Sequence, residues 1–294
     1  MPVIQEGISV FVETILLATD FSQASEKATA YAKALARRFS STVEIAHVFN
    51  PSQVLSEEEA LLSPPPGERR QNSNDYLEQL QNEFLDAKIK VRTVSREGHD
   101  AANTLLNIAK EDNVDLIVAG THSNRGLERL VLGSTAESLF RSASCPVLTV
   151  GPKVELPTGP LAFQSVIFAT DFSTVAARAA AFALSFAEDS NAHLYFLHVV
   201  EAYPGWQHEA PIVDAMFEAS LRKMIPESSY ARCSPECVLE HGEASRGVLA
   251  LAARVHADLI VLGPRKASFL LNHVERGLTP SLLAEATCPV LSFC

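Results

Sequence analysis

The chain has 294 residues, 47% of them hydrophobic and 20% charged, and its formal net charge is −11. This length is enough for two domains that each bury a core, and the composition is ordinary for a soluble globular protein. An acidic pair of domains without a basic face is a poor electrostatic match for nucleic acid or an anionic membrane, so we expect neither as a partner.

The first ten residues and the cysteines bear on the compartment. The first ten residues hold an acidic side chain, no basic cluster and no sustained apolar core, so they predict no signal peptide. No apolar run approaches the length that spans a bilayer. The five cysteines are an odd number, which argues against a disulfide framework. We therefore expect a cytoplasmic protein with reduced thiols.

The first half of the chain alternates strands with helices. An apolar run at residues 13–18 predicts a strand buried on both faces. Ser22 suits the N-cap of a helix that runs to Phe39 with apolar residues at helical spacing. Further strands are predicted at residues 42–49, 89–95, 114–119 and 146–150, and further helices at 71–86, 101–111 and from 134.

The second half repeats this alternation after a linker at residues 151–160, which holds three prolines. Strands are predicted at residues 166–169, 193–199, 237–239, 259–262 and 289–293, and helices at 176–187, near 216 and at 248–255. Such alternation implies right-handed crossovers. The sequence therefore predicts two tandem doubly wound α/β domains, residues 1–152 and 160–294, each an open, mostly parallel sheet with helices on both faces.

Two short segments occur in both halves. Ala-Thr-Asp-Phe-Ser stands at residues 18–22 and again at 169–173, and Cys-Pro-Val-Leu at residues 145–148 and again at 288–291. The two Asp residues are 151 positions apart and the two Cys residues 143. A domain-sized repeat with so small a drift in length predicts two copies of one fold.

The order and spacing of these pieces resemble the universal stress protein family in its tandem two-domain form, over nearly the whole chain. The resemblance also rests on His-Val at residues 47–48 and 198–199, and on Asp-Leu-Ile-Val-x-Gly at 115–120 and 258–263. It implies a five-stranded parallel sheet in each half and a role in stress signalling. In members that keep a particular glycine loop, it also implies an adenine-nucleotide site.

That loop is Gly-x2-Gly-x9-Gly followed by Ser or Thr. The first half has it at residues 120–135, with Ser123 in place of the second glycine. Gly133 would let the backbone approach phosphate oxygens, at the amino end of a helix whose amides and hydroxyls point at them. A serine is harmless at position 123 unless the backbone there needs positive φ or close approach.

Asp20 follows the first strand at the carboxyl edge of the sheet, where open α/β sheets bind ligands. The resemblance implies that Asp20 faces the ribose or a bound metal and that the backbone around Val48 meets the adenine edge. The candidate binding residues are Ala18, Thr19, Asp20, Val48, Gly120, Thr121, His122, Ser123, Gly133, Ser134 and Thr135.

Each of these candidates also has a purely structural reading. Asp20 and Asp171 could cap the helix that follows them, and we expect only this of Asp171. His47 and His198 lie within apolar strands, which favours packed neutral histidines. His122 could be an exposed loop residue. The cysteines that precede Pro146 and Pro289 suit small buried apolar positions.

The loop of the second half departs further from the pattern. Counting back from the closing cysteine, Arg276 takes the place of the last loop glycine, and Gly277 takes that of the serine after it. Pro264 follows Gly263 and removes a backbone N–H donor. We therefore expect one nucleotide site per chain, in the first half.

Three functions are compatible with this sequence. The first is a binding protein for ATP or a related adenine nucleotide, with or without magnesium. The second is a nucleotide-free interaction module of the same family. The third, an ATPase or phosphotransferase, lacks a Walker loop, a nucleophile elbow and a paired-histidine metal motif. The resemblance also implies that the closing strands pair with each other or with another subunit in a homodimer, which would cover exposed edges.

Overall fold

The computed structural model describes residues 10–51, 64–121, 133–157, 159, 161–201, 210–263 and 278–293. The elements of the first half are β1 (Thr14–Ala18), α1 (Gln23–Phe39), β2 (Thr42–Phe49), α3 (Pro66–Asp86), β3 (Val91–Glu97), α4 (Ala101–Glu111), β4 (Leu116–Gly120), α5 (Ser134–Ser142) and β5 (Val147–Val150). Those of the second half are β6 (Ser165–Ala169), α6 (Thr174–Ser190), β7 (His193–Val200), α7 (Ala210–Met224), the 3-10 helix η1 (Glu227–Ala231), β8 (Ser234–His241), α8 (Ala244–Val255), β9 (Leu259–Leu262), α9 (Leu278–Glu285) and β10 (Val290–Ser292).

Three helices differ from the sequence-based expectation. α3 begins at Pro66 and not near residue 71, since a proline is favoured in the first turn, where its missing N–H has no helical partner to lose. The sequence patterns predict neither η1 nor α9. α9 contains Pro280 near its start. A proline is tolerated in the first turn of a helix, although it would break the helix at a later turn.

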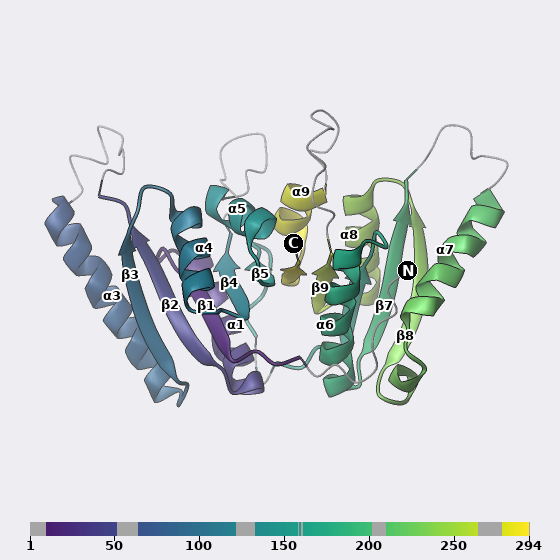
Figure 1. Cartoon of the computed structure of the whole chain (residues 1–294), viewed down its shortest axis with the longest axis horizontal. Coiled ribbons are helices and arrows are strands. Elements are labelled where there is room, and N and C mark those ends of the chain that lie inside the picture. Colours follow the sequence, from purple (N-terminus) through teal and green to yellow (C-terminus); the bar gives the residue numbers. More distant parts are fainter. Residues whose placement is uncertain are drawn as a thin grey trace.

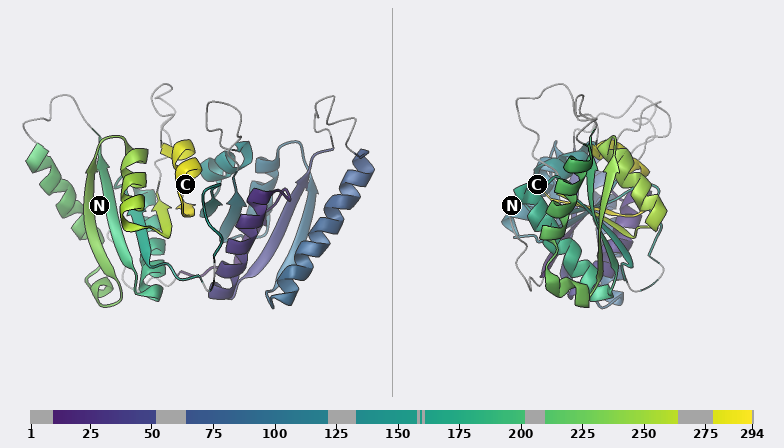
Figure 2. Two further views of the ribbon diagram at one scale, coloured as in Figure 1. Left: turned by 180° about the vertical axis from the view of Figure 1, so that it is seen from behind. Right: turned by 90° about the vertical axis from the view of Figure 1, so that its right-hand side faces the viewer.

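The strands form one sheet in the order β3-β2-β1-β4-β5-β10-β9-β6-β7-β8. Within each half all neighbouring strands are parallel, so each half is the predicted doubly wound unit of five strands. Figure 1 shows the two halves side by side, with β5 and β10 in the middle. The end-on view in Figure 2 shows helices on both faces of the twisted sheet.

The closing strands β5 and β10 pair with each other, and this antiparallel pair joins the two halves into one sheet. Leu148 lies opposite Leu291, and the two side chains are 2% and 1% exposed. Of the two arrangements that the sequence leaves open, the chain adopts the internal one. Each strand covers the backbone edge that the other would expose.

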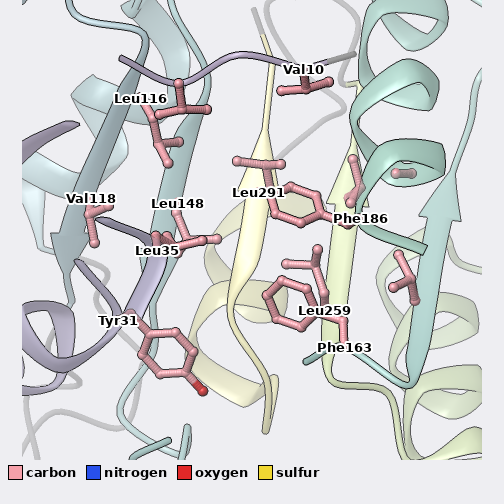
Figure 3. Close-up of a cluster of buried hydrophobic side chains, with 14 of the residues drawn as sticks. Val10, Tyr31, Leu35, Leu116, Val118, Leu148, Phe163, Phe186, Leu259 and Leu291 are labelled. Carbon is pink, nitrogen blue, oxygen red and sulfur yellow. The ribbon is translucent and has the colours of Figure 1, made fainter. Parts of the chain in front are cut away.

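The core is organised differently on the two faces of the sheet. On the face covered by α1, α3, α6 and α7, one apolar cluster runs through both halves. Leu148, Phe163 and Leu291 belong to it, and Figure 3 shows them between side chains of the two halves. On the opposite face each half has its own cluster, although Phe140 of α5 belongs to the cluster of the second half. The two halves therefore share core along one whole face.

The segment predicted as a linker is fixed to both halves. Lys27 of α1 donates to the carbonyl oxygens of Pro152 (2.8 Å) and Val154 (2.7 Å). A Cβ placed on Gly151 would lie 2.5 Å from the carbonyl oxygen of Leu283 in α9, so only glycine allows this approach. The connection is therefore held by hydrogen bonds and close packing along its first residues.

Candidate functional site

The turn after β1 holds Asp20 at the carboxyl edge of the sheet. Its Oδ1 accepts hydrogen bonds from the Ser22 backbone N–H (3.0 Å), the Ser22 hydroxyl (2.5 Å) and the Ser25 hydroxyl (2.5 Å). The Ser22 side chain caps α1 by accepting from the backbone N–H of Ser25, which confirms the predicted N-cap. Asp20 is therefore not the cap. Its side chain is exposed at the edge of the sheet, in a fixed orientation.

The corresponding turn in the second half is built in the same way but holds its carboxylate less firmly. Asp171 Oδ1 accepts from the Ser173 backbone N–H (2.9 Å), and Ser173 caps α6. The expectation that Asp171 is the cap is thus wrong, because the serine two residues later already satisfies the first turn. Ala176 stands where the first half has Ser25, so no hydroxyl from that position reaches Asp171.

The phenylalanine between these residues has a left-handed backbone in both halves. The φ angles are 61° at Phe21 and 59° at Phe172. Such a conformation costs of order 1–3 kcal/mol for a bulky residue, so surrounding contacts must hold it. The Phe21 ring lies 4.5 Å from the His47 ring and 5.4 Å from the Tyr76 ring. This strained turn therefore helps to shape the edge of the site.

A cleft of about 860 Å³ opens at the carboxyl edge of the first half. Its lining residues are Asp20, Phe21, His47, Val48, Phe49, Asn50, Arg69, Ser73, His99, Asp100, Ala101, Ala102, Ser134, Thr135 and Ser138. The cleft brings together Asp20, Val48, Ser134 and Thr135 from the candidate residues of the sequence. Ala18, Thr19, Gly120, Thr121 and Gly133 do not line it, and His122 and Ser123 lie outside the described residues.

The amino terminus of α5 reaches the cleft without a side-chain cap. Gly133 is the N-cap residue, and a glycine has no side chain with which to cap the first turn. Its φ of −58° is open to any residue, and among the described residues a Cβ there would meet only the Thr121 hydroxyl, at 3.9 Å. The N–H groups of Ser134 and Thr135 have no partner within the helix, and with the helix dipole behind them they suit an anion.

Thr121 lies behind this helix start. It is 2% exposed, and its hydroxyl has no hydrogen-bond partner among the described residues. A buried hydroxyl without a partner is unfavourable by roughly 1–3 kcal/mol. Thr121 therefore supplies an unused polar group next to Gly133, at the base of the region in which the sequence places phosphate.

Gly120 is explained by packing. A Cβ on Gly120 would lie 2.2 Å from the carbonyl oxygen of Ala24, at the start of α1. Gly263 is equivalent in the second half, where a Cβ would lie 2.5 Å from the Ala176 Cα. Because both halves need the glycine for the same contact between strand and helix, Gly120 is not by itself a sign of a ligand.

The histidines of the two edges are neutral and packed. His47 Nδ1 donates to the Thr19 carbonyl oxygen (2.9 Å), and His198 Nδ1 donates to that of Thr170 (2.8 Å). Burial is the main cause that lowers the pKa of both rings below the usual value, against the opposing effects of these hydrogen bonds and of the nearby carboxylates. Both rings are therefore packed within the fold, and His47 also lines the cleft.

These two histidines predict a loss of stability in mild acid. Their folded-state pKa values lie below the unfolded value of about 6.5, so protons bind preferentially to the unfolded chain as the pH falls. The contribution of these histidines to the free energy of unfolding should be complete above about pH 6.5 and should decrease below it. Urea unfolding at a series of pH values should show this decrease, reduced in the double variant His47→Gln/His198→Gln. The exposed His193→Gln is the control, and an unchanged slope in the double variant would contradict the prediction.

The cleft residues that the sequence does not indicate include Arg69 and Ser73 on α3, and His99 and Asp100 before α4. Asp100 caps α4 through the Asn103 backbone N–H (3.0 Å). The rule that ligands bind beyond the carboxyl ends of strands applies equally to residues after β3, so it could have found His99 and Asp100. No local pattern indicates that α3 turns Arg69 and Ser73 toward the cleft.

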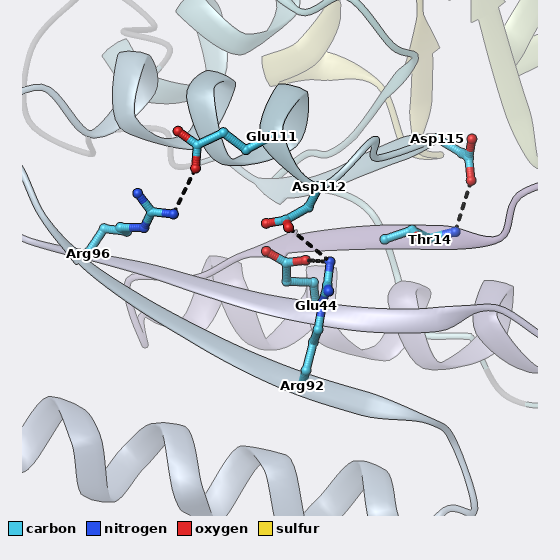
Figure 4. Close-up of polar contacts among 7 residues, drawn as sticks. All are labelled: Thr14, Glu44, Arg92, Arg96, Glu111, Asp112 and Asp115. Carbon is cyan, nitrogen blue, oxygen red and sulfur yellow. Dashed lines mark hydrogen bonds and ion pairs between the residues drawn. The ribbon is translucent and has the colours of Figure 1, made fainter.

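The charged cluster in Figure 4 lies outside this cleft. Glu44, near the start of β2, is fully buried and pairs with Arg92 of β3, whose guanidinium also lies 3.6 Å from Asp112. Burial raises the pKa of Glu44 although Arg92 opposes the shift. Asp115 accepts from the backbone N–H of Thr14 (2.9 Å) and so ties β1 to the start of β4. These groups stabilise the amino edge of the sheet.

In the described part of the chain, no three His, Cys, Asp or Glu side chains gather in a way that could hold a metal ion by themselves. None of the helices described has the length and apolar character needed to cross a membrane.

The chain matches the universal stress protein family over residues 12–151 and 162–293. Universal stress protein MJ0531 of Methanocaldococcus jannaschii is 33% identical over 161 residues, which are 52% of this chain and 90% of that protein. The crystal structure of a universal stress protein from Archaeoglobus fulgidus DSM 4304 has a TM-score of 0.71 at 20% identity and covers 95% of this chain and 97% of its own. One from Pseudomonas aeruginosa UCBPP-PA14 has a TM-score of 0.57 at 16% identity, with coverages of 96% and 92%. The solved structures share the fold over both halves, and the match spans both repeats, so this chain belongs to the universal stress protein family.

Proposed function

We propose that the first half binds ATP or a related adenine nucleotide in the cleft at the carboxyl edge of its sheet, and that the second half serves as a partner domain without such a site. One observation carries the proposal. The cleft joins an oriented carboxylate, Asp20, to the end of β2 at Val48 and to the uncapped start of α5. Asp20 suits the ribose of a nucleotide, the end of β2 at Val48 suits the base, and the start of α5 suits the phosphates.

Each part of the ligand has a partner of suitable chemistry. The N–H groups and hydroxyls of Ser134 and Thr135 donate to phosphate oxygens, and the dipole of α5 favours their charge. The Asp20 carboxylate accepts hydrogen bonds from ribose hydroxyls. The base lies against the end of β2 at Val48. A stress-response protein of this kind would respond to the nucleotide level through occupancy of the cleft.

A magnesium ion fits this site only together with the nucleotide. Mg²⁺ is commonly bound by one or two carboxylates with phosphate oxygens and water. The described lining holds two carboxylates, Asp20 and Asp100, and both oxygens of Asp100 are engaged with Asn103. Asp20, oriented at the carboxyl edge beside the start of α5, is the residue that would join the nucleotide phosphates in the ion's shell.

Isothermal titration calorimetry with ATP and ADP, with and without magnesium, tests the proposal. We expect about one site per chain. Ser134→Glu should weaken ATP binding by at least about tenfold, since it places a carboxylate beside the phosphates, and should preserve the fold because an acidic residue suits a helix start. Gln23→Glu makes the same charge change at the exposed start of α1, outside the cleft lining, and should leave binding unchanged.

Two results would contradict the proposal. Absence of binding at millimolar ATP would favour a nucleotide-free interaction module. Two equivalent sites per chain would show that the second half also binds, contrary to the assignment of the site to the first half.

A further inference from the structure

We infer that Arg69, together with Ser73 on the same face of α3, recognises the base of the ligand and so determines which nucleotide the cleft accepts. This inference rests on the proposed function and concerns the end of the cleft away from α5. The first reason is the state of the Arg69 side chain. Its Nε is buried without a hydrogen-bond partner, and no carboxylate among the described residues lies within ion-pair distance of its guanidinium. The next residue, Arg70, pairs with Glu97 at 3.2 Å.

The guanidinium of Arg69 is placed by an aromatic ring. It lies 6.0 Å from the centroid of the Phe49 ring, at the end of β2, and both residues line the cleft. This contact orients a planar group of N–H donors that has no acceptor in the described protein. A buried donor left unpaired is unfavourable, so a ligand that offers an acceptor there gains affinity.

The position of α3 in the fold shows which part of the ligand Arg69 meets. α3 packs on β2 and β3, whereas α5 packs on β5. β1 and β4 lie between β2 and β5 in the sheet, which makes three strand spacings, or about 14 Å at about 4.8 Å each. A phosphate held by Ser134 therefore lies at the α5 end of the cleft, and Arg69 lies at the α3 end. What reaches Arg69 is the opposite end of the same molecule, beside Val48 and Phe49.

A purine base has the chemistry that this end requires. Its ring nitrogens are acceptors that can take the Arg69 N–H groups, as the N7 atoms of purines do when arginine reads bases in DNA. The flat face of the base can also lie against the guanidinium and the neighbouring apolar wall. The Ser73 hydroxyl, whose hydrogen bond goes to the Arg69 carbonyl oxygen (3.0 Å), keeps lone pairs to accept from an amino group of the base.

The second half supports this assignment by contrast. His241 ends β8 as Glu97 ends β3, 144 residues earlier, and the same offset takes Arg69 to Val213 and Ser73 to Phe217. The Phe217 ring stacks on Phe172 (5.8 Å between centroids, 8° between planes) and lies 4.4 Å from the His198 ring. Aromatic rings pack at this edge in both halves, but the second half has Val213 and Phe217 at the positions where the first half has the donors of Arg69 and Ser73. The pair therefore occurs in the half to which nucleotide binding is assigned.

Calorimetry with two ligands separates a role at the base from a role at the phosphates. Arg69→Met keeps an unbranched apolar side chain against Phe49 and removes the donors. This variant should lower the affinities for ATP and for adenosine by the same factor, about tenfold each, because adenosine keeps the base and lacks the phosphates. Ser134→Glu should lower the affinity for ATP and leave the affinity for adenosine unchanged. Arg70→Met removes an equal charge from the same helix, from a residue that does not line the cleft, and should weaken neither.

The stability of the variant gives a second readout. Arg69→Met should not lower the free energy of unfolding, because the buried Nε has no partner to lose. If Arg69→Met lowered the affinity for ATP and not the affinity for adenosine, the inference would be overturned, since Arg69 would then act on the phosphates. Unchanged affinity for both ligands would overturn it as well, while the proposed function would stand. Failure of the wild-type protein to bind either ligand would instead refute the proposed function and this role with it.

Discussion

Replacing Leu148 by alanine should lower the free energy of unfolding of the whole chain by about 2–5 kcal/mol, the usual range for a large-to-small change in a packed core. Leu148 is 2% exposed, lies opposite Leu291 in the strand pair that joins the halves, and belongs to the apolar cluster that runs through both of them. The cavity would therefore open at the junction and not within one half. Both halves should lose protection together, in a single unfolding transition.

Urea unfolding followed by circular dichroism, combined with native-state hydrogen exchange, checks this result. The matched control is Leu156→Ala, the same substitution at a side chain that is 55% exposed, which should change the free energy by less than about 0.5 kcal/mol. Two separate transitions, with only the first half affected by Leu148→Ala, would show that the shared core does not couple the halves.

Gly120→Ala should lower the free energy of unfolding by about 1–3 kcal/mol, because overpacking of this size displaces backbone. The added Cβ would lie 2.2 Å from the Ala24 carbonyl oxygen, and neither a strand end nor a helix start can move aside as a flexible side chain would. The start of α1 should shift, and with it the turn that carries Asp20. Nucleotide affinity should therefore fall together with stability.

Gly133→Ala is the matched comparison for Gly120→Ala. Of the described atoms, its Cβ would meet only the Thr121 hydroxyl, at 3.9 Å, and the φ of −58° is acceptable for alanine, so stability should stay within about 0.5 kcal/mol of wild type. If the phosphates need the open backbone of Gly133, only affinity should fall in this variant. Equal destabilisation by both substitutions, measured by urea unfolding, would contradict the distinction between a packing glycine and a ligand glycine.

The cooperation of the two halves gives the second half a role even without a nucleotide. Its closing strand covers β5, and Phe140 of α5 packs into its apolar cluster. The helix whose start is proposed to hold phosphate is thus supported from both halves. Under the proposed function, a partner domain without a nucleotide site would still fix the geometry of the site beside it.

The sequence alone was sufficient for the alternation of strands and helices, the doubled fold and the Ser22 cap. These features follow from local rules, since hydrophobic spacing and capping residues act within a few positions of one another. The repeated Asp at residues 20 and 171 also marked the carboxyl edge of each sheet correctly. The same pattern suggested that these aspartates could cap the helices that follow, but Ser22 and Ser173 are the caps.

Only the tertiary structure decided what lies across from these residues. It showed that β5 pairs with β10, that Gly120 and Gly263 both serve packing, and that Arg69 and Ser73 line the cleft of the first half. Such contacts join residues far apart in the chain, and their free energies depend on exact approach distances that no local pattern records. For the same physical reason, two nearly identical strand ends can face different side chains, such as Tyr76 against Phe21 in one half and Phe217 against Phe172 in the other.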